Sequence, residues 1–400
     1  MTGGGESQSI LIAGGGIGGL AAALGLARKG YRSIVLEQAP ELGEIGAGIQ
    51  IGPNAFHAFD RLGVGDAARA KAVCIDHLVL MDAIQDERIA AIPLDAPFRT
   101  RFKNPYAVIH RADLHKVLLD ACRDSRLIAL RTRSAVDRYD QDGDGVTVTL
   151  RSGERVAGAA LIGADGLRSR IRAQLVGDGE PRVSGHTTFR SVIPAERMPA
   201  ELRWNAATLW AGPKCHIVHY PLKGGNVFNL VVTCHNDAAE AVAGRPVGRE
   251  EVRRGFEHVA DRPRQIIERG ENWKLWVLCD RDPTPGWVDG RVVLLGDAAH
   301  PTLQYLAQGA CMALEDAVNL AHHLAAADGR WNEAFRAYNA DRFVRTGRVQ
   351  VNSRLMGDYV YHPDAGRAAL RNAILGTSTP DQHYDRIAWL YGVTGLGTPV

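Results

Sequence analysis

The sequence predicts an α/β fold in which a Rossmann-like parallel sheet is interrupted by a mainly antiparallel sheet and followed by a helical C-terminal segment. Three observations support this fold class. A strand, a glycine-rich turn and a helix open the chain, alternating strand-like runs fill residues 184–280, and helical patterns dominate after residue 307. With 400 residues, the chain exceeds the roughly 250–300 residues at which single cores stop growing, so we expect two domains.

The N-terminal pattern is that of a βαβ unit. Residues 9–13 form a short apolar strand, and residues 17–29 are rich in alanine and leucine, lack proline and stop at Gly30, as a helix with a glycine C-cap does. Residues 33–37 then form a second strand that ends in Glu37. The unit has the length of about thirty residues that a dinucleotide-binding βαβ unit requires.

The turn between this first strand and helix fits a G-x-G-x-x-G pattern at Gly14, Gly16 and Gly19. The first glycine permits the tight bend, the second lets the backbone approach a pyrophosphate, and the third lets helix and strand pack closely. The pyrophosphate is then expected at the positive end of the helix. Glu37 can accept hydrogen bonds from a ribose 2′-hydroxyl, which predicts an adenosine ribose without a 2′-phosphate. A glycine string alone often binds nothing, but the surrounding strand, helix and Glu37 favour a dinucleotide.

The middle of the chain favours an antiparallel sheet. Residues 214–222 and 227–235 alternate as strands do and are joined by Lys223-Gly224-Gly225-Asn226, a good hairpin signal. The next helical pattern covers residues 249–268. The short run Asp142-Gly143-Asp144-Gly145 is most simply a hairpin tip.

The last part of the chain returns to strand and helix. Residues 288–297 show a strand followed by a turn, and residues 307–325 predict an amphipathic helix. A helical tail follows, which contains Trp331, Tyr338 and Phe343.

Composition excludes several other classes of protein. Hydrophobic residues make up 46% and charged residues 23%, and the net charge is +2 with both signs interspersed, so neither nucleic acid nor an anionic membrane is an expected partner. The six cysteines lack the paired spacing of a metal site or a redox motif, and no metal is expected. There is no signal-peptide pattern and no apolar run of roughly 18–20 residues, which predicts a cytoplasmic protein.

Two further segments give the glycine turn its context, Gly163-Ala164-Asp165-Gly166 and Gly296-Asp297-Ala298-Ala299-His300-Pro301. With the N-terminal turn, in this order and spacing, they resemble the FAD-dependent aromatic hydroxylases, the single-component flavoprotein monooxygenases with a p-hydroxybenzoate hydroxylase-like fold. The resemblance implies FAD as the bound dinucleotide. There is only one G-x-G-x-x-G turn, which favours transient docking of NAD(P)H over a separate domain for it, and the resemblance implies NADH as this co-substrate.

The same resemblance implies roles for further residues around FAD. Asp297 would hold the ribityl chain, and the backbone amides of Gly309 and Ala310 would lie against the flavin pyrimidine at a helix N-terminus. Asp165 would stabilise the loop under the pyrophosphate. Arg168, Arg170 and Arg172 would either contact the phosphates of the nicotinamide nucleotide or form a solvated basic helix. The remaining implied contacts are Arg111 and the loop Gly46-Ala47-Gly48-Ile49-Gln50 beside the flavin ring.

A candidate base lies in the antiparallel sheet. Side chains alternate along a strand, so His216 and Tyr220 share one face, whereas His219 points the other way. Ring hydroxylation is fastest when a ring hydroxyl is deprotonated, and histidine is a natural base for a phenol whose pKa is near 10. A bare His-x-x-x-Tyr pair is more often structural than catalytic, so this assignment depends on its neighbours.

Those neighbours resemble the 3-hydroxybenzoate 6-hydroxylase group within the family, on the segments around His216, Tyr106 and Gln304. The resemblance implies that His216 takes the phenolic proton, that Gln304 orients the ring hydroxyl, and that Tyr220 and Tyr106 hold the carboxylate. Asp76 is expected to border the pocket. The implied reaction is para-hydroxylation of 3-hydroxybenzoate to 2,5-dihydroxybenzoate (gentisate), with NADH and O2, through a flavin C4a-hydroperoxide.

Alternatives remain open at this level. Salicylate 1-hydroxylase and 6-hydroxynicotinate 3-monooxygenase belong to the same family and are alternative activities. A flavin oxidase or dehydrogenase is an alternative of a different class, which would use the cofactor without inserting oxygen. A homodimer is expected. The expected FAD-binding domain comprises residues 1–72, 103–183 and 285–345, the substrate domain residues 73–102 and 184–284, and the C-terminal helical segment residues 346–400.

Overall fold

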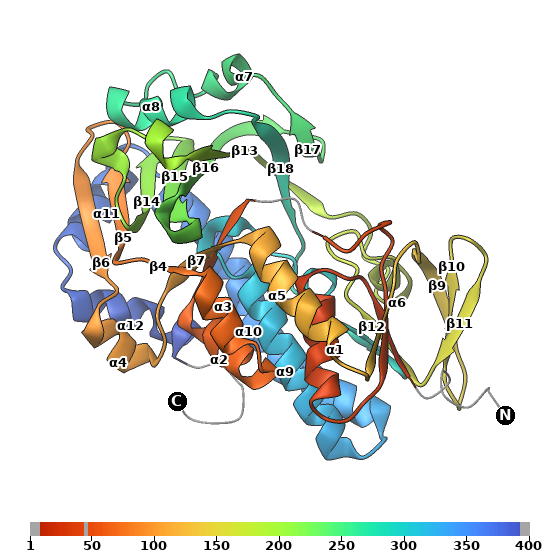
Figure 1. The fold of residues 1–400 in the computed structure, drawn as a ribbon. Coiled ribbons are helices and arrows are strands. Elements are labelled where there is room, and N and C mark those ends of the chain that lie inside the picture. Colours follow the sequence, from red (N-terminus) through yellow and green to blue (C-terminus); the bar gives the residue numbers. More distant parts are fainter. Residues whose placement is uncertain (1–8, 44–46, 393–400) are drawn as a thin grey trace.

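The computed structural model describes residues 9–43 and 47–392 and shows two sheet-based halves linked by helices (Figure 1). The half that contains β1 and β12 carries a six-stranded sheet, and the half that contains β13–β18 carries an eight-stranded sheet. Within the described ranges, no helix is both long and apolar enough to cross a membrane. The predicted fold class is confirmed: a Rossmann-like sheet, a mainly antiparallel sheet and C-terminal helices.

The six-stranded sheet is parallel except at one edge. Its order is β19 (Val288–Asp289), β20 (Val292–Leu294), β12 (Ala160–Gly163), β1 (Ile10–Ala13), β2 (Ser33–Leu36) and β8 (Ile128–Arg131). Only β19 pairs antiparallel. The inner strands β1, β2 and β12 are apolar or small and buried throughout, as parallel strands covered on both faces must be. The predicted N-terminal βαβ unit is confirmed, with Glu37 directly after β2.

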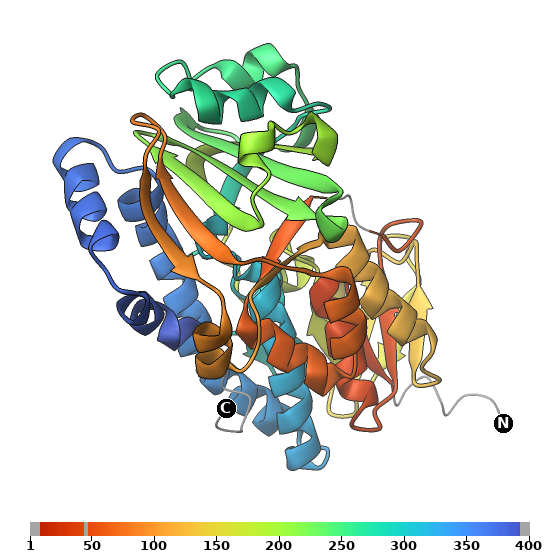
Figure 2. The ribbon, with the colours of Figure 1, turned by 60° about the vertical axis from the view of Figure 1, so that its left-hand side comes forward.

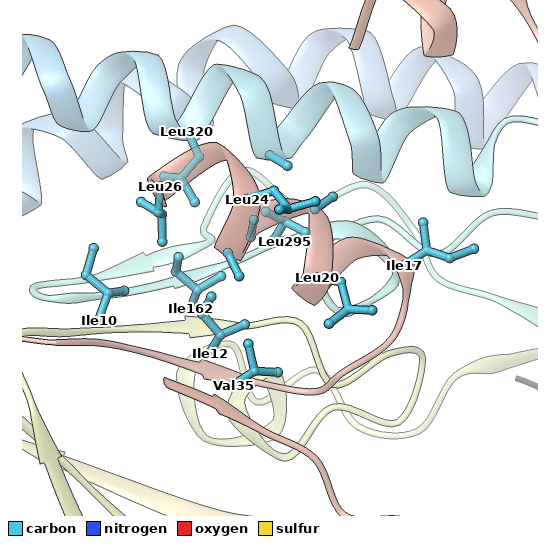
Figure 3. Close-up of a cluster of buried hydrophobic side chains, with 14 of the residues drawn as sticks. Ile10, Ile12, Ile17, Leu20, Leu24, Leu26, Val35, Ile162, Leu295 and Leu320 are labelled. Atoms are coloured by element: carbon cyan, nitrogen blue, oxygen red, sulfur yellow. The ribbon is translucent and has the colours of Figure 1, made fainter. Parts of the chain in front are cut away.

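Helices cover this sheet and form its core. Ile10, Ile12 and Ile162 of the sheet meet Leu20 and Leu24 of the first helix (Figure 3). The helices of this half are α1 (Ile17–Ala27), α2 (Pro53–Leu62), α3 (Gly65–Lys71), α5 (Arg111–Arg123), α6 (Arg170–Leu175) and α9 (Gly309–Ala327).

Helices α1 and α9 lie closer than larger side chains would permit. A Cβ atom added at Gly25 of α1 would be 2.8 Å from the carbonyl oxygen of Ala317 in α9. Nearer to the glycine turn, a Cβ atom at Gly18 would lie 3.4 Å from the Ala313 Cβ atom, so α9 lies against α1 there as well.

Two three-stranded sheets flank the large ones. One contains β9 (Val136–Gln141), β10 (Val146–Leu150) and β11 (Arg155–Gly158), and its β9–β10 tip closes with the Asp142 amide donating to the Gly145 carbonyl at 3.1 Å, as predicted. The other contains β3 (Gly48–Ile51), β7 (Ala107–His110) and β4 (Val73–Cys74).

The eight-stranded sheet is antiparallel except between β14 and β5. Its order is β17 (Ala243–Pro246), β18 (Lys274–Asp280), β13 (Arg182–Pro194), β16 (Val227–Ala238), β15 (Cys215–Leu222), β14 (Ala206–Gly212), β5 (His77–Asp82) and β6 (Arg88–Pro93). The predicted hairpin is present, since the turn Lys223–Gly225 joins β15 to β16.

The prediction of a single helix over residues 249–268 is wrong. The chain instead forms two short helices, α7 (Arg249–Arg253) and α8 (Asp261–Arg269). Gly255 adopts φ +88°, a left-handed conformation that a helix cannot contain. Phe256 and Val259 in the interruption are buried in the core under the large sheet.

The C-terminal helices lie along one side of both halves (Figure 2). They are α10 (Trp331–Met356), the π-helical turn η6 (Gly357–Tyr361), α11 (Ala365–Gly376) and α12 (Pro380–Tyr391), and α4 (Ala96–Phe102) packs against α12. Helix α10 runs unbroken through residues 345 and 346, so the domain boundary expected there falls inside a helix. The division into domains otherwise stays a prediction.

Candidate active site

The N-terminal glycine turn is shaped by close backbone contacts. Gly14 has φ +104°, and a Cβ atom there would lie 2.4 Å from the Ala164 carbonyl oxygen. A Cβ atom at Gly19 would lie 1.9 Å from the Gly14 carbonyl oxygen. Gly16 is the N-cap of α1 and lines a cavity of about 370 Å³. The N-terminus of α1 therefore opens onto this cavity, as a pyrophosphate site requires.

Glu37 lies beside this turn at the end of β2. Its Oε2 accepts a hydrogen bond from the Gly15 amide and its Oε1 one from the Ala39 amide, both at 2.7 Å. The side chain is half-buried. A carboxylate held in this way has its charge fixed next to the turn, where the adenosine ribose is expected.

Helix α6, which follows the glycine-bearing segment at residues 163–166, is hydrogen-bonded to the segment at residues 296–301. Asp165 caps α6, because its Oδ1 accepts from the Ser169 hydroxyl at 2.5 Å and its Oδ2 from the Arg170 amide at 2.8 Å. Arg172 is fully buried and donates to the carbonyl oxygens of Ala298 (3.0 Å) and Ala299 (2.6 Å).

Neither reading of the three arginines holds for Arg172. Arg172 is fully buried and pairs with Asp178, an exposed residue, at 2.6 Å, so it is a structural brace and neither a phosphate contact nor a solvated residue. Arg168 and Arg170 are exposed and lie near Glu180 and Asp137, respectively.

The third segment and the start of α9 form the far wall of the cavity. Asp297, Gly309 and Ala310 all line it. Gly296 turns with φ +62°, and its amide donates to Asp316 Oδ2 at 3.0 Å. The amides at the N-terminus of α9 thus face the same cavity as those of α1, and together they make it favourable for an anionic, phosphate-bearing group.

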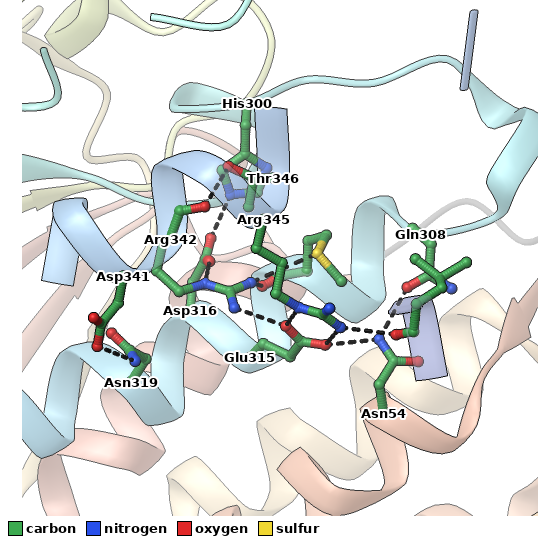
Figure 4. A network of polar contacts seen from close by, with 12 residues as sticks. Asn54, His300, Gln308, Glu315, Asp316, Asn319, Asp341, Arg342, Arg345 and Thr346 are labelled. Atoms are coloured by element: carbon green, nitrogen blue, oxygen red, sulfur yellow. Dashed lines mark hydrogen bonds and ion pairs between the residues drawn. The ribbon is translucent and has the colours of Figure 1, made fainter. Parts of the chain in front are cut away.

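A buried polar network fixes this wall from behind (Figure 4). Arg342 of α10 donates to Glu315 and to Asp316 of α9, each at 2.7 Å, and all three side chains are fully buried. Asp316 also accepts from His300 Nε2 at 2.5 Å. The buried face of α9 therefore carries charged side chains as well as apolar ones. The prediction of a simple amphipathic helix did not include them.

The loop and strand at residues 47–50 join the cofactor side to the large sheet. The Gly48 amide donates to Asn229 Oδ1 of β16 at 2.7 Å. A Cβ atom at Gly48 would lie 2.5 Å from Tyr220 Cε2. Ala47 is buried, its carbonyl accepts from the Arg111 amide at 2.9 Å, and Gly48, Gln50 and Arg111 line the cavity. Gly46 lies outside the described residues.

His216 and Tyr220 meet the cofactor segments in the same cavity. Both belong to β15 and line the cavity together with Val218, whereas His219 is buried on the opposite face, where Trp210 Nε1 donates to its Nδ1 at 3.3 Å. His216 is 1% exposed, and burial lowers its pKa well below the ordinary value. The direction of this shift favours the neutral imidazole, the form that has a nitrogen free to accept a proton.

Gln304 lines the cavity but its amide is already engaged. Its Nε2 donates to the hydroxyls of Thr188 and Thr233, both at 3.1 Å, and its Oε1 accepts from Arg190 at 3.0 Å. These three bonds fix the orientation of the amide, so only its oxygen retains capacity for a ligand.

Two of the expected substrate residues lie elsewhere. Tyr106 lines a second, mostly apolar cavity of about 360 Å³ and donates to Gln50 Oε1 at 2.7 Å. This second cavity adjoins the first, because Gln50, Val218, Ala307 and Tyr361 line both.

Asp76 is exposed between β4 and β5, where its amide bonds the Asn205 carbonyl, and it lines neither cavity. The expectation that Asp76 borders the substrate pocket therefore stays a prediction.

Sequence reasoning missed two features of the site, one residue that lines the cavity and one that lies behind His216. Arg190 of β13 lines the cavity, its Nε is buried without a hydrogen bond, and within the described part of the chain it has no carboxylate partner. A charged residue in the interior of a 13-residue strand was the available signal. The second is His362, whose Nε2 lies 2.7 Å from His216 Nδ1. Nothing in the local sequence indicates that contact, since 146 residues separate the two.

Comparison with known proteins identifies the protein family. A family model described as an FAD binding domain matches residues 7–352. 3-Hydroxybenzoate 6-hydroxylase 1 of Aquipseudomonas alcaligenes is 58% identical over 388 residues, 96% of this chain and 98% of that protein. The 3-hydroxybenzoate 6-hydroxylase of Polaromonas naphthalenivorans is 48% identical over 383 residues, 96% of this chain and 95% of the relative.

A solved structure agrees with the sequence matches. Klebsiella pneumoniae HpxO complexed with FAD and uric acid superposes with a TM-score of 0.86 at 26% identity, over 96% of each chain. The relatives span nearly the whole chain, and the cavity between the two sheets has the helix N-termini that FAD requires. This chain is a flavoprotein that belongs to the family of FAD-dependent aromatic hydroxylases.

Proposed function

We propose that this enzyme hydroxylates 3-hydroxybenzoate at C6, para to the hydroxyl group, to give 2,5-dihydroxybenzoate (gentisate). The observation that carries the proposal is that two residues line the cavity that also contains Asp297 and the start of α9. One is a neutral histidine, His216, and the other is Arg190, which has no carboxylate partner among the residues that the structure describes. A hydroxybenzoate presents one phenolic proton and one carboxylate to such a pair. The names of the relatives support the same substrate.

His216 is proposed as the base for the phenol. Its Nδ1 is occupied by His362, so Nε2 is the nitrogen available to a ligand in the cavity. Removal of the phenolic proton places electron density on the ring carbons ortho and para to the oxygen. C6 of 3-hydroxybenzoate is para to that oxygen, which accounts for the position of attack.

Arg190 and Tyr220 are proposed to hold the carboxylate. Arg190 lies close enough to Tyr220 for their charges to interact, and its guanidinium stacks over Trp276 with 5.5 Å to the ring centroid. A guanidinium without an ion-pair partner gains a charge-assisted hydrogen bond from a bound carboxylate. In this arrangement Gln304 acts by fixing Arg190, and Tyr106 acts by holding Gln50.

The residues around the cavity fit FAD. Gly14, Gly16, Gly19 and Glu37 would hold its adenosine and pyrophosphate half, with Asp165 stabilising the loop beneath. Asp297, Gly309 and Ala310 would hold the ribityl chain and flavin ring, with Ala47, Gly48, Gln50 and Arg111 on the other side. When bound, FAD reduced by NADH activates O2 and supplies the hydroxyl group.

The proposal is tested by NADH consumption with three substrates, namely 3-hydroxybenzoate, salicylate and 6-hydroxynicotinate, with the products identified by chromatography. Gentisate formed from 3-hydroxybenzoate in step with NADH oxidation is the expected result. Catechol from salicylate, with only peroxide from 3-hydroxybenzoate, would overturn the substrate assignment. Peroxide without any ring hydroxylation would indicate a flavin oxidase, and a parallel assay with NADPH tests the proposed preference for NADH.

We also propose that the enzyme is a homodimer. Apolar side chains are exposed on two C-terminal helices, namely Val344, Val351 and Leu355 on α10 and Leu370 and Ile374 on α11. Val344, Val351 and Leu355 recur at intervals of seven and four residues, which places them on one face of the helix. A second copy of the chain would remove this face from water.

A further inference from the structure

The boundary between the two cavities is formed by side chains that line both of them. These are Gln50, Val218, Ala307 and Tyr361, which we call the partition. The first cavity measures about 370 Å³ and contains the proposed base and flavin site, and the second measures about 360 Å³. The space available to a substrate therefore ends at the partition and not at the wall of the protein.

Tyr361 is the largest side chain of the partition and is held from two sides. Its ring packs edge-on against the rings of His216 and Tyr305, with centroids 4.8 Å and 4.9 Å away. Tyr361 ends the π-helical turn η6, which closes with the His362 amide donating to the Gly357 carbonyl at 2.9 Å. A Cβ atom at Gly357 would lie 2.8 Å from Tyr305 Cε2, so the turn is in close contact with Tyr305. These contacts fix the ring of Tyr361 beside the proposed base.

The other members of the partition belong to the elements that form the substrate side of the first cavity. Val218 lies between His216 and Tyr220 on the same face of β15. Gln50 belongs to β3, and its Oε1 accepts from the Tyr106 hydroxyl at 2.7 Å. The partition therefore closes the first cavity where the ring of a substrate is expected.

The second cavity suits a hydrocarbon group. Its lining includes the aliphatic side chains of Leu80, Ile92, Leu209 and Ile387. An apolar group that enters such a lining leaves water, which is favourable, and few polar groups of the protein lose a partner. The second cavity is nearly as large as the first, so the partition is what limits the size of the substrate.

The ring of 3-hydroxybenzoate has one free edge in the proposed binding mode. C1 carries the carboxylate held by Arg190 and Tyr220, and C3 carries the hydroxyl group next to His216. C2 lies between these two anchors, and C6 is the position of attack. Only C4 and C5 remain, so a group attached at this edge displaces neither anchor and leaves the reacting carbon free.

We propose that the partition, and Tyr361 above all, determines specificity by restricting this enzyme to hydroxybenzoates with a single ring. The inference rests on the proposed function, because it uses the same anchors and the same reaction. Truncation of Tyr361 joins the two cavities into one space. A substrate with a second ring fused at C4 and C5 then places that ring in the second cavity. This substrate is 4-hydroxy-2-naphthoate.

The naphthoate undergoes the same oxygen insertion as the benzoate. Its C1 is para to the hydroxyl group and adjacent to the carbon that carries the carboxylate, as C6 is in 3-hydroxybenzoate. One atom of O2 enters the C–H bond at C1. The other leaves as water, with the hydride of NADH and one proton. The product is 1,4-dihydroxy-2-naphthoate, which mass spectrometry distinguishes from gentisate.

The test compares 3-hydroxybenzoate with 4-hydroxy-2-naphthoate on purified holoenzyme. Binding is measured as the change in the visible spectrum of the oxidised flavin when either compound is added, and turnover as product formed with NADH. Wild type should hydroxylate 3-hydroxybenzoate and scarcely the naphthoate. Tyr361→Ala should raise the ratio of kcat/KM for the naphthoate to that for 3-hydroxybenzoate at least about tenfold, since one methylene group in an apolar pocket already changes discrimination by about 10–200-fold.

Further variants separate the size of the binding space from a disturbance of the base. Val218→Ala removes another part of the partition and should shift the ratio in the same direction. Tyr361→Phe retains the ring, so the ratio should stay low. Ile92→Ala is the matched control, because Ile92 lines only the second of the two cavities and its truncation leaves the partition intact. A disturbance of His216 would lower kcat for both substrates together and leave the ratio unchanged.

Three results would overturn the inference. The first is a wild type that hydroxylates the naphthoate as efficiently as 3-hydroxybenzoate, because the partition would then exclude nothing. The second is an unchanged ratio in both Tyr361→Ala and Val218→Ala, and Val218→Ala alone decides if Tyr361→Ala does not retain FAD. The third is an equal rise in Ile92→Ala.

Failure of the proposed function gives a different result. Wild type would then form no gentisate from 3-hydroxybenzoate. The spectral measurement would still decide the inference, because tighter binding of the naphthoate by Tyr361→Ala than by wild type supports the partition, and equal binding overturns it.

Discussion

His216 is the side chain whose removal should slow the reaction most. His216→Ala is expected to lower the rate of hydroxylation by about 10²–10⁴, the usual range for loss of a general base, with FAD content unchanged. The reason is that the phenol, with a pKa near 10, remains protonated at neutral pH without a nearby acceptor. Single-turnover hydroxylation followed by product analysis checks the change, and an unaltered rate would refute the assignment.

Arg190 makes a separate prediction about the carboxylate. Arg190→Gln should raise the KM for 3-hydroxybenzoate by about 10–10²-fold, because a hydrogen bond between charged groups contributes about 1.5–3 kcal/mol. The KM for 3-hydroxybenzyl alcohol, which lacks the carboxylate, should change little. Arg190→Lys serves as the charge-preserving control. An equal loss for both substrates would mean that Arg190 only supports Gln304 and does not bind the carboxylate.

For single residues, the sequence predicted correctly those whose placement follows from the local strand pattern. His216 and Tyr220 were placed on one cavity-lining face by strand alternation, and the structure brings them there. Tyr106 and Asp76 were assigned by resemblance, and neither lines the first cavity. Strand alternation says which side chains share a face, but it cannot say which distant segment covers that face. For that reason His362 could not be predicted.

At the scale of elements, the contact between β3 and β15 is tight enough to test. Gly48→Ala would place a Cβ atom 2.5 Å from Tyr220 Cε2 and 2.9 Å from Asn229 Cγ. Overpacking of this kind typically costs about 1–3 kcal/mol. We expect displacement of Tyr220, a lower melting temperature and a smaller fraction of NADH oxidation that yields product. Gly43→Ala is the control, because a Cβ atom there meets nothing within 4 Å.

The network between α9 and α10 predicts a pH dependence of stability. Burial raises the pKa of Asp316, but His300 and Arg342 outweigh burial and bring it to about 2. An aspartate in an unfolded chain titrates near 3.9. Because the folded pKa is the lower one, the stabilisation is fully present above about pH 4 and is lost as the pH falls toward 2.

Urea unfolding between pH 3 and 6 measures this contribution. Asp316→Asn should lower the free energy of unfolding by about 3–5 kcal/mol at neutral pH, since it leaves Arg342 without one buried partner. It should also flatten the acid side of the stability profile. Asp124→Asn, at an exposed position, should change neither quantity, and an unaltered profile in Asp316→Asn would contradict the assignment.

Elements with start and stop signals were predicted well, and those without them were not. The first helix was expected over residues 17–29 and is observed as Ile17–Ala27, because Gly30 provides a clear end. Residues 249–268 carry helix-forming side chains on both sides of Gly255, and the burial of Phe256 and Val259 decides the break. Tertiary packing, which a local pattern does not contain, made that difference.

At the scale of the whole molecule, three glycine-bearing segments far apart in the sequence come together around one cavity. Gly14 approaches Ala164, and Arg172 ties the second segment to Ala298 and Ala299 of the third. The order of the segments predicted the family, but the braces between them required the structure. Arg172 was interpreted as a ligand contact or a solvated residue because its local sequence is basic, and the two carbonyl groups that it binds in the third segment lie more than one hundred residues away.

The exposed apolar face on α10 makes the last prediction, which concerns assembly. Val344 is 70% exposed and Leu355 is 56% exposed, and a stable interface that covered them and α11 should bury more than about 1,000 Å² in total. The double variant Val344→Glu and Leu355→Glu would place charges in such an interface and should convert a dimer to a monomer in sedimentation velocity, with FAD retained. Lys29→Glu, at an exposed position near the end of α1, is the control for added charge. A double variant that sediments as the wild type does would place the interface elsewhere, because two buried glutamates could not be accommodated without a counterion.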